Sequence, residues 1–166
     1  MPDHDAIVAE IPRLRRYARA LLGAHDGADD LVQDTLETAL AKWRFWQWGR
    51  ELRPWLFSIM HNRHVDTLRS SKRLEFHAPD EMPEMSLPAS QGDALALRDL
   101  DRALAALPLE QREVLLLVGL EELSYAETAR VLGVPQGTVM SRLARGRGRL
   151  RSVLAGEPVV DLKVVK

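Results

Sequence analysis

Arginine side chains are concentrated in one short segment near the end of the chain. The stretch that begins at Val134 reads VPQGTVMSRLARGRGRL. Arginines occupy its positions 142, 145, 147 and 149, and Arg151 follows directly after it. A guanidinium group can pair bidentately with guanine in the major groove of DNA, or with a backbone phosphate. Val139, Leu143 and Leu150 keep helical spacing in the same segment. The pattern therefore predicts an amphipathic helix with a cationic face.

The residues that precede this segment predict a helix-turn-helix. Ser124 and Glu127 have the spacing of a capping box, in which the hydroxyl and the carboxylate each accept a free backbone N–H. The capped helix is expected to end at Leu132, and Gly133 can adopt the positive φ of the turn that follows. The second helix of such a motif fits the major groove with its N-terminal end toward the bases. We expect the earlier arginines to lie near bases and the later ones, from Arg147 onward, near phosphates.

Charge is segregated along the chain, although the net charge is −1. Residues 124–155 contain six arginines and one acid, Glu127, whereas residues 74–101 contain seven acids and one base. Charged residues on a helix usually form a solvated surface. Six arginines beside one acid, five of them behind a capped helix and a glycine turn, instead favour contact with DNA.

Composition bounds the class of protein. The chain has 166 residues, of which 46% are hydrophobic and 28% charged, and it contains no cysteine. Disulfides, thiolate chemistry and cysteine-based zinc sites are therefore excluded. The sequence has no apolar run near the roughly 20 residues that span a bilayer and no basic and apolar leader at its N-terminus. We expect a cytoplasmic protein with no membrane insertion.

Hydrophobic periodicity predicts an all-α fold made of two small helical domains. The first domain, residues 1–73, would hold helices at Ile7–Leu22 and Leu31–Trp43, a loop at 44–52, and a long third helix with Pro54 in its first turn. Residues 74–93 contain three prolines and many acids, which predicts a flexible acidic linker. The second domain, residues 94–155, would hold a helix at 97–107, a helix at 109–119 and the helix-turn-helix, followed by a tail at 156–166.

Catalytic and metal-binding patterns are weak in this sequence. His61 and His64 stand three residues apart on the expected third helix, but a metal site needs further ligands and none is apparent. No Ser-His-Asp spacing, glycine-rich phosphate loop or HExxH motif is present. We therefore expect neither an enzyme nor a cofactor.

Two separate motifs resemble bacterial RNA polymerase sigma factors of the extracytoplasmic-function (ECF) group, within the sigma-70 family. The segment LPLEQREVLLLVGLEELSYAETARVLGVPQGTVMSRLARGRGRL resembles their −35-reading domain. ADDLVQDTLETAL resembles the helix that they press against the polymerase clamp, and RPWLFSIMHNRHVDTLRSSKR resembles their −10-binding helix. The resemblance runs from about Arg13 to Leu154. It implies core RNA polymerase and promoter DNA as partners, and a dedicated anti-sigma factor as regulator.

The resemblance also implies three sets of contact residues. The polymerase surface would comprise Asp30, Leu31, Gln33, Asp34 and Glu37. The −10 surface would comprise Trp46, Trp48, Asn62, Arg63, Asp66, Arg69, Lys72 and Arg73. The −35 surface would comprise Gln136, Thr138, Met140, Ser141, Arg142, Arg145, Arg147 and Arg149. Met140 stands where the family usually places Lys or Arg.

The tryptophans of the first domain have alternative interpretations. Trp46 and Trp48 lie in the loop that resembles the family's base-capturing loop, and stacking on an unpaired base suits an aromatic side chain. Packing in the core is the commoner role of tryptophan, and both residues are open to it. Trp43 and Trp55 fall on helical stripes, so we expect these two in the core.

Two other functions are compatible with the same motifs. One is a stand-alone helix-turn-helix repressor or activator, which would bind duplex DNA without polymerase. The other is a sigma-like decoy of the general stress response, which binds an anti-sigma factor and no DNA. Decoys usually carry a fused receiver domain, and the basic residues on both expected DNA surfaces argue against that role. The sequence does not reveal the promoter sequence, the inducing signal or the identity of the anti-sigma factor.

Overall fold

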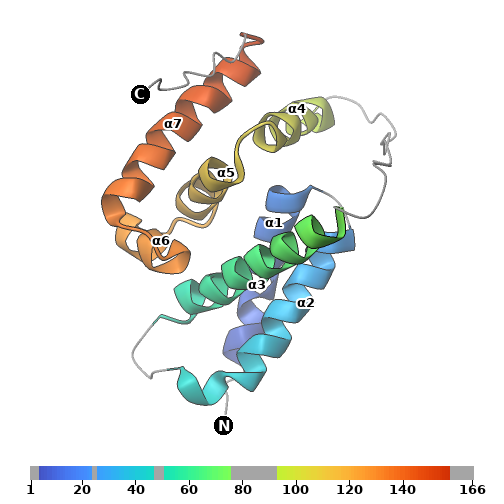
Figure 1. The fold of residues 1–166 in the computed structure, drawn as a ribbon, viewed down its shortest axis with the longest axis vertical. Helices are drawn as coiled ribbons and strands as arrows, with labels where there is room; N and C mark the ends of the chain where they lie inside the picture. Colours follow the sequence, from blue (N-terminus) through green and yellow to red (C-terminus); the bar gives the residue numbers. More distant parts are fainter. Residues whose placement is uncertain (1–3, 24–25, 47–50, 76–92, 158–166) are drawn as a thin grey trace.

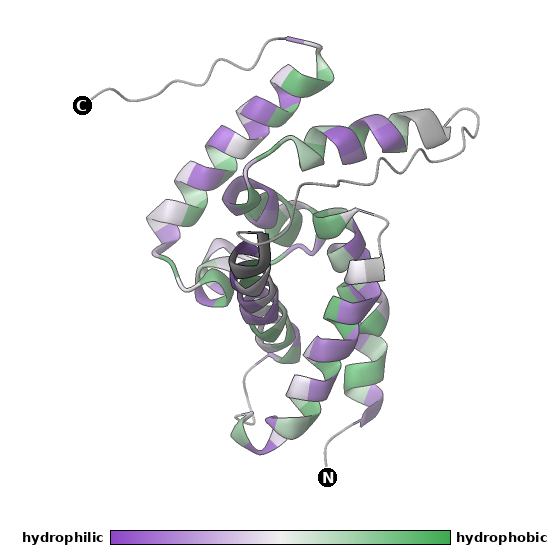
Figure 2. Cartoon of the chain, turned by 45° about the vertical axis from the view of Figure 1, so that its right-hand side comes forward, coloured by the Kyte–Doolittle hydropathy of each residue, from purple (hydrophilic) through white to green (hydrophobic). Residues whose placement is uncertain are grey.

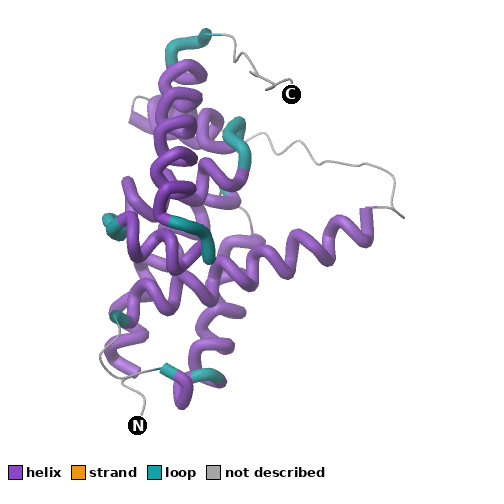
Figure 3. Tube along the Cα trace, turned by 60° about the vertical axis from the view of Figure 1, so that its left-hand side comes forward, coloured by secondary structure: helices purple, strands orange, loops and turns teal. Residues whose placement is uncertain are grey.

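The computed structural model describes residues 4–23, 26–46, 51–75 and 93–157. Within these ranges every regular element is a helix, as Figures 1 and 3 show, so the expected all-α class is confirmed. The elements are α1 (His4–Leu22), α2 (Asp26–Ala41), η1 (Trp43–Phe45), α3 (Leu52–Glu75), α4 (Asp93–Ala105), α5 (Leu109–Leu115), η2 (Leu116–Leu120), α6 (Tyr125–Leu132) and α7 (Gln136–Leu154). None of these helices combines the length and the apolar character that crossing a bilayer requires.

The N-terminal unit consists of α1, α2, η1 and α3. Within it, α2 packs against both α1 and α3. Its core includes Leu14 and Tyr17 from α1 and Phe57 from α3, all with almost no exposed surface. The rings of Tyr17 and Phe57 meet edge to face, with centroids 5.0 Å apart. Gly23 follows the last residue of α1 with a φ of 76°, a conformation that favours glycine, and it ends the helix as expected.

The C-terminal unit consists of α4, α5, η2, α6 and α7, with α7 packed against α4, α5 and α6. Its core includes Val114, Leu117 and Val139, and hydrophilic and hydrophobic positions alternate along α7 (Figure 2). Gly146 is buried where α7 meets α5. A Cβ atom added at this residue would lie 3.1 Å from a Leu115 methyl group. The missing side chain therefore allows the two helices to approach closely.

The two units pack against each other. α6 lies against α3, and α1 lies against α4 and η2 (Figure 1). One cluster of buried hydrophobic side chains runs through both units. Arg112 of α5 strengthens this contact, because its guanidinium donates to the carbonyl of Leu21 at 3.0 Å as well as to the carbonyls of Leu104, Ala105 and Leu107.

Several helix bounds differ from the sequence-based expectations. Trp43, Arg44 and Phe45 form the short 3₁₀ helix η1 at a place where Arg44 was expected to begin a loop. The helix expected at 109–119 divides into α5 and the π-helix η2, which ends at Leu120. Most of the expected linker and tail, at 76–92 and 158–166, lies outside the described residues. The proposed domain limits therefore stay predictions.

Candidate nucleic-acid interface

The helix-turn-helix begins with the expected capping box. The Ser124 hydroxyl accepts a hydrogen bond from the Glu127 N–H at 3.1 Å, and the Glu127 carboxylate accepts one from the Ser124 N–H at 2.8 Å. The bond from the Ser124 backbone lowers the pKa of Glu127, with smaller contributions from Glu51 and Arg130. Two N–H groups that α6 leaves without intrahelical partners are therefore satisfied.

The turn between α6 and α7 is set by Gly133 and Pro135. Gly133 has a φ of 66°, and the Val134 N–H donates to the carbonyl of Ala129 at 3.1 Å. Pro135 is the N-cap residue of α7 in an extended conformation, and its carbonyl accepts from the Thr138 N–H at 3.0 Å. The predicted helix-turn-helix is confirmed in its bounds and in the conformation of its turn.

α7 buries Val139, Leu143 and Gly146 and leaves a polar surface on its other side. The predicted −35 residues that are exposed are Gln136, Met140, Ser141, Arg145 and Arg147. Thr138, Arg142 and Arg149 are half-buried, and Arg142 lies 3.9 Å from the Glu110 carboxylate. Most of the predicted −35 set therefore lies on one accessible surface.

The predicted polymerase surface on α2 differs from expectation at one residue. Asp30, Gln33, Asp34 and Glu37 are exposed, and the Gln33 amide donates to the Glu37 carboxylate at 3.3 Å. Leu31 is 5% exposed and belongs to the hydrophobic core, so its assignment to this surface was wrong. Helical spacing turns its side chain toward α1 and α3, away from the four polar residues.

The predicted −10 residues of α3 lie along its exposed side. Asn62, Arg63, Asp66, Arg69 and Lys72 are all accessible, and the Arg63 Nε donates to the Thr38 hydroxyl at 2.8 Å. This bond orients one arginine of the −10 set against the last full turn of α2. Trp48 and the side chain of Arg73 lie outside the described residues.

The aromatic residues before α3 form a packed cluster. The ring of Trp46 lies 5.0 Å from that of Trp43 and 6.5 Å from that of Trp55, and Trp43 and Trp55 are 6.2 Å apart between centroids. All three are half-buried. The neighbouring Phe45, which the sequence analysis did not select, is 80% exposed.

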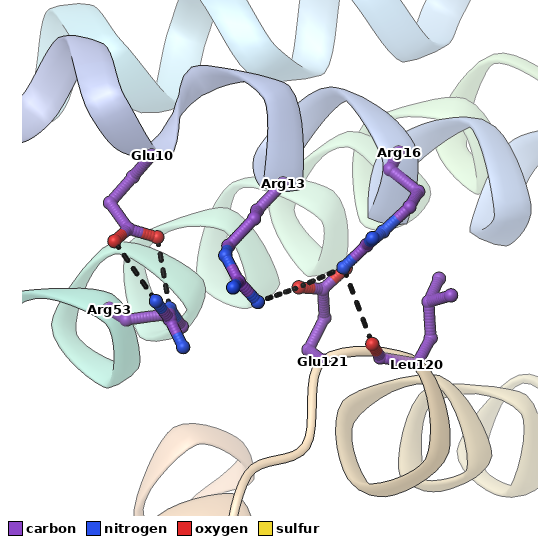
Figure 4. Close-up of polar contacts among 6 residues, drawn as sticks. All are labelled: Glu10, Arg13, Arg16, Arg53, Leu120 and Glu121. Atoms are coloured by element: carbon purple, nitrogen blue, oxygen red, sulfur yellow. Dashed lines mark hydrogen bonds and ion pairs between the residues drawn. The ribbon is translucent and has the colours of Figure 1, made fainter.

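A polar cluster between the units was also missed by sequence reasoning (Figure 4). The Glu121 side chain has no exposed surface, and Arg16 donates to its two oxygens at 3.1 and 3.2 Å. The same guanidinium donates to the Leu120 carbonyl at 3.3 Å, and Arg13 lies 3.8 Å from the Glu121 carboxylate. Glu122, next in the chain, has a φ of 57° and is exposed. The backbone turn therefore leaves the Glu122 side chain in solvent while that of Glu121 is buried.

The two histidines singled out in the sequence lie at the same contact between units. The His61 Nδ1 is 2.7 Å from the Glu113 carboxylate of α5, and Glu113 is itself buried. His64 is also buried, and burial lowers its pKa while the charge of Glu113 acts in the opposite direction. In the described part of the chain, no group of three potential ligands could hold a metal ion.

Comparison with known proteins agrees with this geometry. Residues 7–61 match the model of the Sigma2 domain of PhyR, and residues 87–150 match the model of Sigma-70, region 4. The chain is 39% identical over 152 residues to the ECF RNA polymerase sigma factor EcfG of Rhodopseudomonas palustris, covering 90% of this chain and 83% of the relative. It is 37% identical to the ECF RNA polymerase sigma factor SigM of Mycobacterium tuberculosis, covering 86% and 71% respectively.

Solved structures show the same arrangement of helices. The sigma factor RpoE of Bartonella quintana, in complex with the anti-sigma factor NepR, superposes with a TM-score of 0.82 at 33% identity, over 95% of this chain and 97% of that one. CnrH, in complex with the cytosolic domain of CnrY, superposes with a TM-score of 0.70 at 25% identity, over 93% and 88%. The chain therefore belongs to the ECF group of RNA polymerase sigma factors.

Proposed function

We propose that this chain binds core RNA polymerase, directs it to promoters and opens the −10 element in the cytoplasm, where transcription takes place. The observation that carries the proposal is the pair of accessible polar faces, one on α3 and one on α7, in a chain that belongs to the ECF sigma factors. In this role the chain catalyses no reaction itself. It supplies binding surfaces to an enzyme that does.

The proposed −35 contacts divide by position along α7. Arg142 and Arg145 are nearer the N-terminal end, where bidentate pairing with guanine contributes roughly 1–3 kcal/mol of discrimination. Arg147 and Arg149 follow further along and would contact phosphates, which fix the register of the helix on DNA. Met140 is 51% exposed beside them, and its thioether side chain suits contact with a thymine methyl group.

The acidic face of α2 is the proposed polymerase surface. Asp30, Asp34 and Glu37 are exposed carboxylates, and carboxylates repel the phosphates of DNA. A protein partner is the physically favourable use of such a face. We place the polymerase clamp there, because this segment resembles the clamp-binding helix of the family.

An anti-sigma factor is the proposed regulator. The RpoE structure with a TM-score of 0.82 is a complex with the anti-sigma factor NepR, and it covers both units of this chain. That similarity supports a partner of the NepR kind here.

A decoy that sequesters an anti-sigma factor is the second candidate. It is favoured by one observation, namely that the model matching residues 7–61 is that of the Sigma2 domain of PhyR. The accessible arginines on α3 and α7 favour the sigma factor instead, since a decoy has no need of DNA contacts.

In vitro transcription with core polymerase tests the proposal. A library of random promoter sequences is transcribed with and without the chain, and we expect transcripts that depend on the chain and share −10 and −35 sequences. A stand-alone regulator would bind duplex DNA tightly without polymerase. A decoy would bind a NepR-type protein and yield no transcript from any promoter.

Two variants assign the surfaces in the same assay. Arg145→Ala should weaken −35-dependent initiation, and Asp34→Ala should weaken binding to core polymerase without changing affinity for duplex DNA. Arg102→Ala and Asp99→Ala are matched charge controls, because both residues are exposed on α4 and belong to neither predicted contact set. Equal effects of Arg145→Ala and Asp34→Ala on both readouts would contradict the assignment.

A further inference from the structure

Two threonines of α2, Thr35 and Thr38, are buried and bond the backbone in the same way. The Thr35 hydroxyl donates to the carbonyl of Leu31 at 2.7 Å. The Thr38 hydroxyl donates to the carbonyl of Asp34 at 2.8 Å. A threonine in a helix often donates to the carbonyl four residues before it, so this bond alone indicates no function. The two residues differ in what else they contact.

Thr38 has a second partner on the neighbouring helix α3. The Arg63 Nε donates to the Thr38 hydroxyl at 2.8 Å, where α2 and α3 pack against each other (Figure 1). A hydroxyl has one hydrogen to donate and two lone pairs that accept. Because the Asp34 carbonyl can only accept, the hydrogen of Thr38 is directed to it and a lone pair faces Arg63. The two bonds together therefore fix the orientation of this hydroxyl.

The bond to Thr38 occupies one part of the Arg63 guanidinium and leaves the rest available. A guanidinium carries N–H donors on Nε, Nη1 and Nη2, and here the Nε donor faces Thr38. The Arg63 side chain is nevertheless exposed. The length of 2.8 Å is typical of a charged donor, and Thr38 is only 8% exposed, so little water competes for its hydroxyl. The guanidinium is thus held at Nε, while its end can bind a ligand with two acceptors side by side.

Arg63 also has a carboxylate within reach on its own helix. Asp66 is three residues further along α3, a spacing at which an arginine and an aspartate on a helix can pair. Such a pair would neutralise the arginine and turn it along the helix axis. In the structure the Arg63 side chain bonds Thr38 instead. Thr38 therefore keeps the charge of Arg63 available to a ligand outside the protein.

We propose that Thr38 is a positioning residue for −10 recognition, which holds Arg63 so that the end of its guanidinium pairs with two neighbouring acceptors on −10 DNA. This inference rests on the proposed function and deepens it. A guanine edge and a phosphate group both offer two acceptors at a spacing that suits a guanidinium. Thr38 acts through Arg63, since its own hydroxyl already has both of its bonds within the protein.

Open-complex formation tests this role on a promoter that the wild-type holoenzyme selects from the library. The reactivity of unpaired thymines with permanganate reports strand opening. Thr38→Val keeps the shape of the side chain and removes the hydroxyl. It should reduce open complexes by roughly 3- to 30-fold, because an arginine that is not held in place must lose its rotamer freedom when it binds. Thr38→Ser keeps the hydroxyl and should retain most of the opening.

Thr35→Val is the matched control. It removes the same kind of buried hydroxyl and the same kind of backbone bond from the same helix, whereas the bond from an arginine belongs to Thr38. Opening should stay at the wild-type level in this variant. Urea denaturation and binding to core polymerase are measured in parallel for every variant. Equal losses of opening in Thr35→Val and Thr38→Val would overturn the inference, because they would show a general effect on α2.

A double-mutant cycle separates positioning from a direct role of Thr38. Arg63→Ala should reduce opening at least as much as Thr38→Val does. Adding Thr38→Val to Arg63→Ala should then change opening by less than about twofold. An equal loss from Thr38→Val with and without Arg63 would contradict the inference, and so would a defect of Thr38→Val that is confined to polymerase binding.

Promoter selection by the Arg63→Ala holoenzyme identifies the acceptor. If the guanidinium pairs with guanine, the selected promoters should lose their preference at one −10 position. If it pairs with a phosphate, all promoters should weaken to a similar extent and the dependence of binding on salt should become less steep. Each result supports contact with DNA, whereas selection and opening that Arg63→Ala leaves unchanged would exclude it.

The proposed function and this inference fail in different ways. If the wild-type holoenzyme selects no promoter, the proposed function fails and the inference fails with it. If the wild-type holoenzyme opens its promoters and Thr38→Val opens them equally well, the inference alone fails.

Discussion

Two carboxylate–arginine contacts lie side by side on α1, and they differ in their burial and in the units that they join (Figure 4). Glu10 accepts from the Arg53 Nε at 3.0 Å, and Arg16 donates to Glu121 at 3.1 Å, so the chemistry is the same. Glu10 and Arg53 both belong to the N-terminal unit and retain exposed surface, whereas Glu121 has none and joins the two units. The comparison teaches that burial and connectivity decide the effect of an ion pair more than its length does.

Removing the arginine from the buried contact should have the largest effect. Arg16→Ala leaves the Glu121 carboxylate buried with Arg13 at 3.8 Å as its remaining charged partner, and we expect the free energy of unfolding to fall by about 3 kcal/mol. Urea denaturation measures this change. Arg15→Ala, which affects a neighbouring surface contact with Asp29 at 3.9 Å, should change it by less than about 0.5 kcal/mol. Equal losses of free energy of unfolding in Arg16→Ala and Arg15→Ala would contradict the claim that burial determines the contribution of the ion pair.

The buried contact should also respond to pH, whereas substitution of Glu121 should abolish that response. Burial raises the pKa of Glu121, although Arg16 and Arg13 act to lower it. The folded chain therefore binds a proton at Glu121 more readily than the unfolded chain, and this group should add to the free energy of unfolding as pH falls from 7 toward the ordinary value of 4.5.

His64 opposes this trend, because burial lowers its pKa from 6.5 and its neutral form is favoured in the folded chain. Its contribution to stability is complete above pH 6.5 and is lost as pH falls below that value. From pH 7.5 to 5, the free energy of unfolding measured by urea denaturation should therefore change in opposite directions in Glu121→Gln and His64→Gln, each compared with wild type. Changes of the same sign in both variants would contradict one of the two assignments. His61, Glu113 and Arg112 face the same contact and are left unchanged.

The exposed contact should show the smallest effect. Arg53→Ala should lower the free energy of unfolding by at most about 1 kcal/mol, and a double-mutant cycle with Glu10→Ala should give a coupling of similar size. High salt should remove most of that coupling, because screening acts strongly on partly exposed charges. A coupling energy between Arg53 and Glu10 as large as that between Arg16 and Glu121 would contradict the claim that the exposed contact contributes less.

Local features of the molecule could be predicted from the sequence. The capping box of Ser124 and Glu127, the positive φ of Gly133 and the apolar stripe through Val139 each depend on residues a few positions apart. Local spacing determines these structures, and the sequence displays it directly.

Features that depend on distant residues could not be predicted. Arg16 and Glu121 are 105 positions apart, and nothing in the pair Glu121-Glu122 indicates which acid is buried. That choice follows from the end of η2 and from the left-handed conformation of Glu122. In the same way, the spacing of the tryptophans did not reveal that Trp46 packs internally while Phe45 is exposed. The DNA and polymerase contacts themselves stay predictions.

The bonds of Arg112 have a consequence for how the chain is made. Its acceptor at Leu21 is 91 residues earlier in the sequence, and Arg16 precedes Glu121 by 105 residues. At about 5–20 residues per second, a ribosome needs roughly 5 to 20 s to add that many residues. For that interval the side of α1 that the C-terminal unit later covers is in contact with water in every nascent copy. A protein that recognises this side of α1 therefore has time to bind during synthesis, before the C-terminal unit packs against α1.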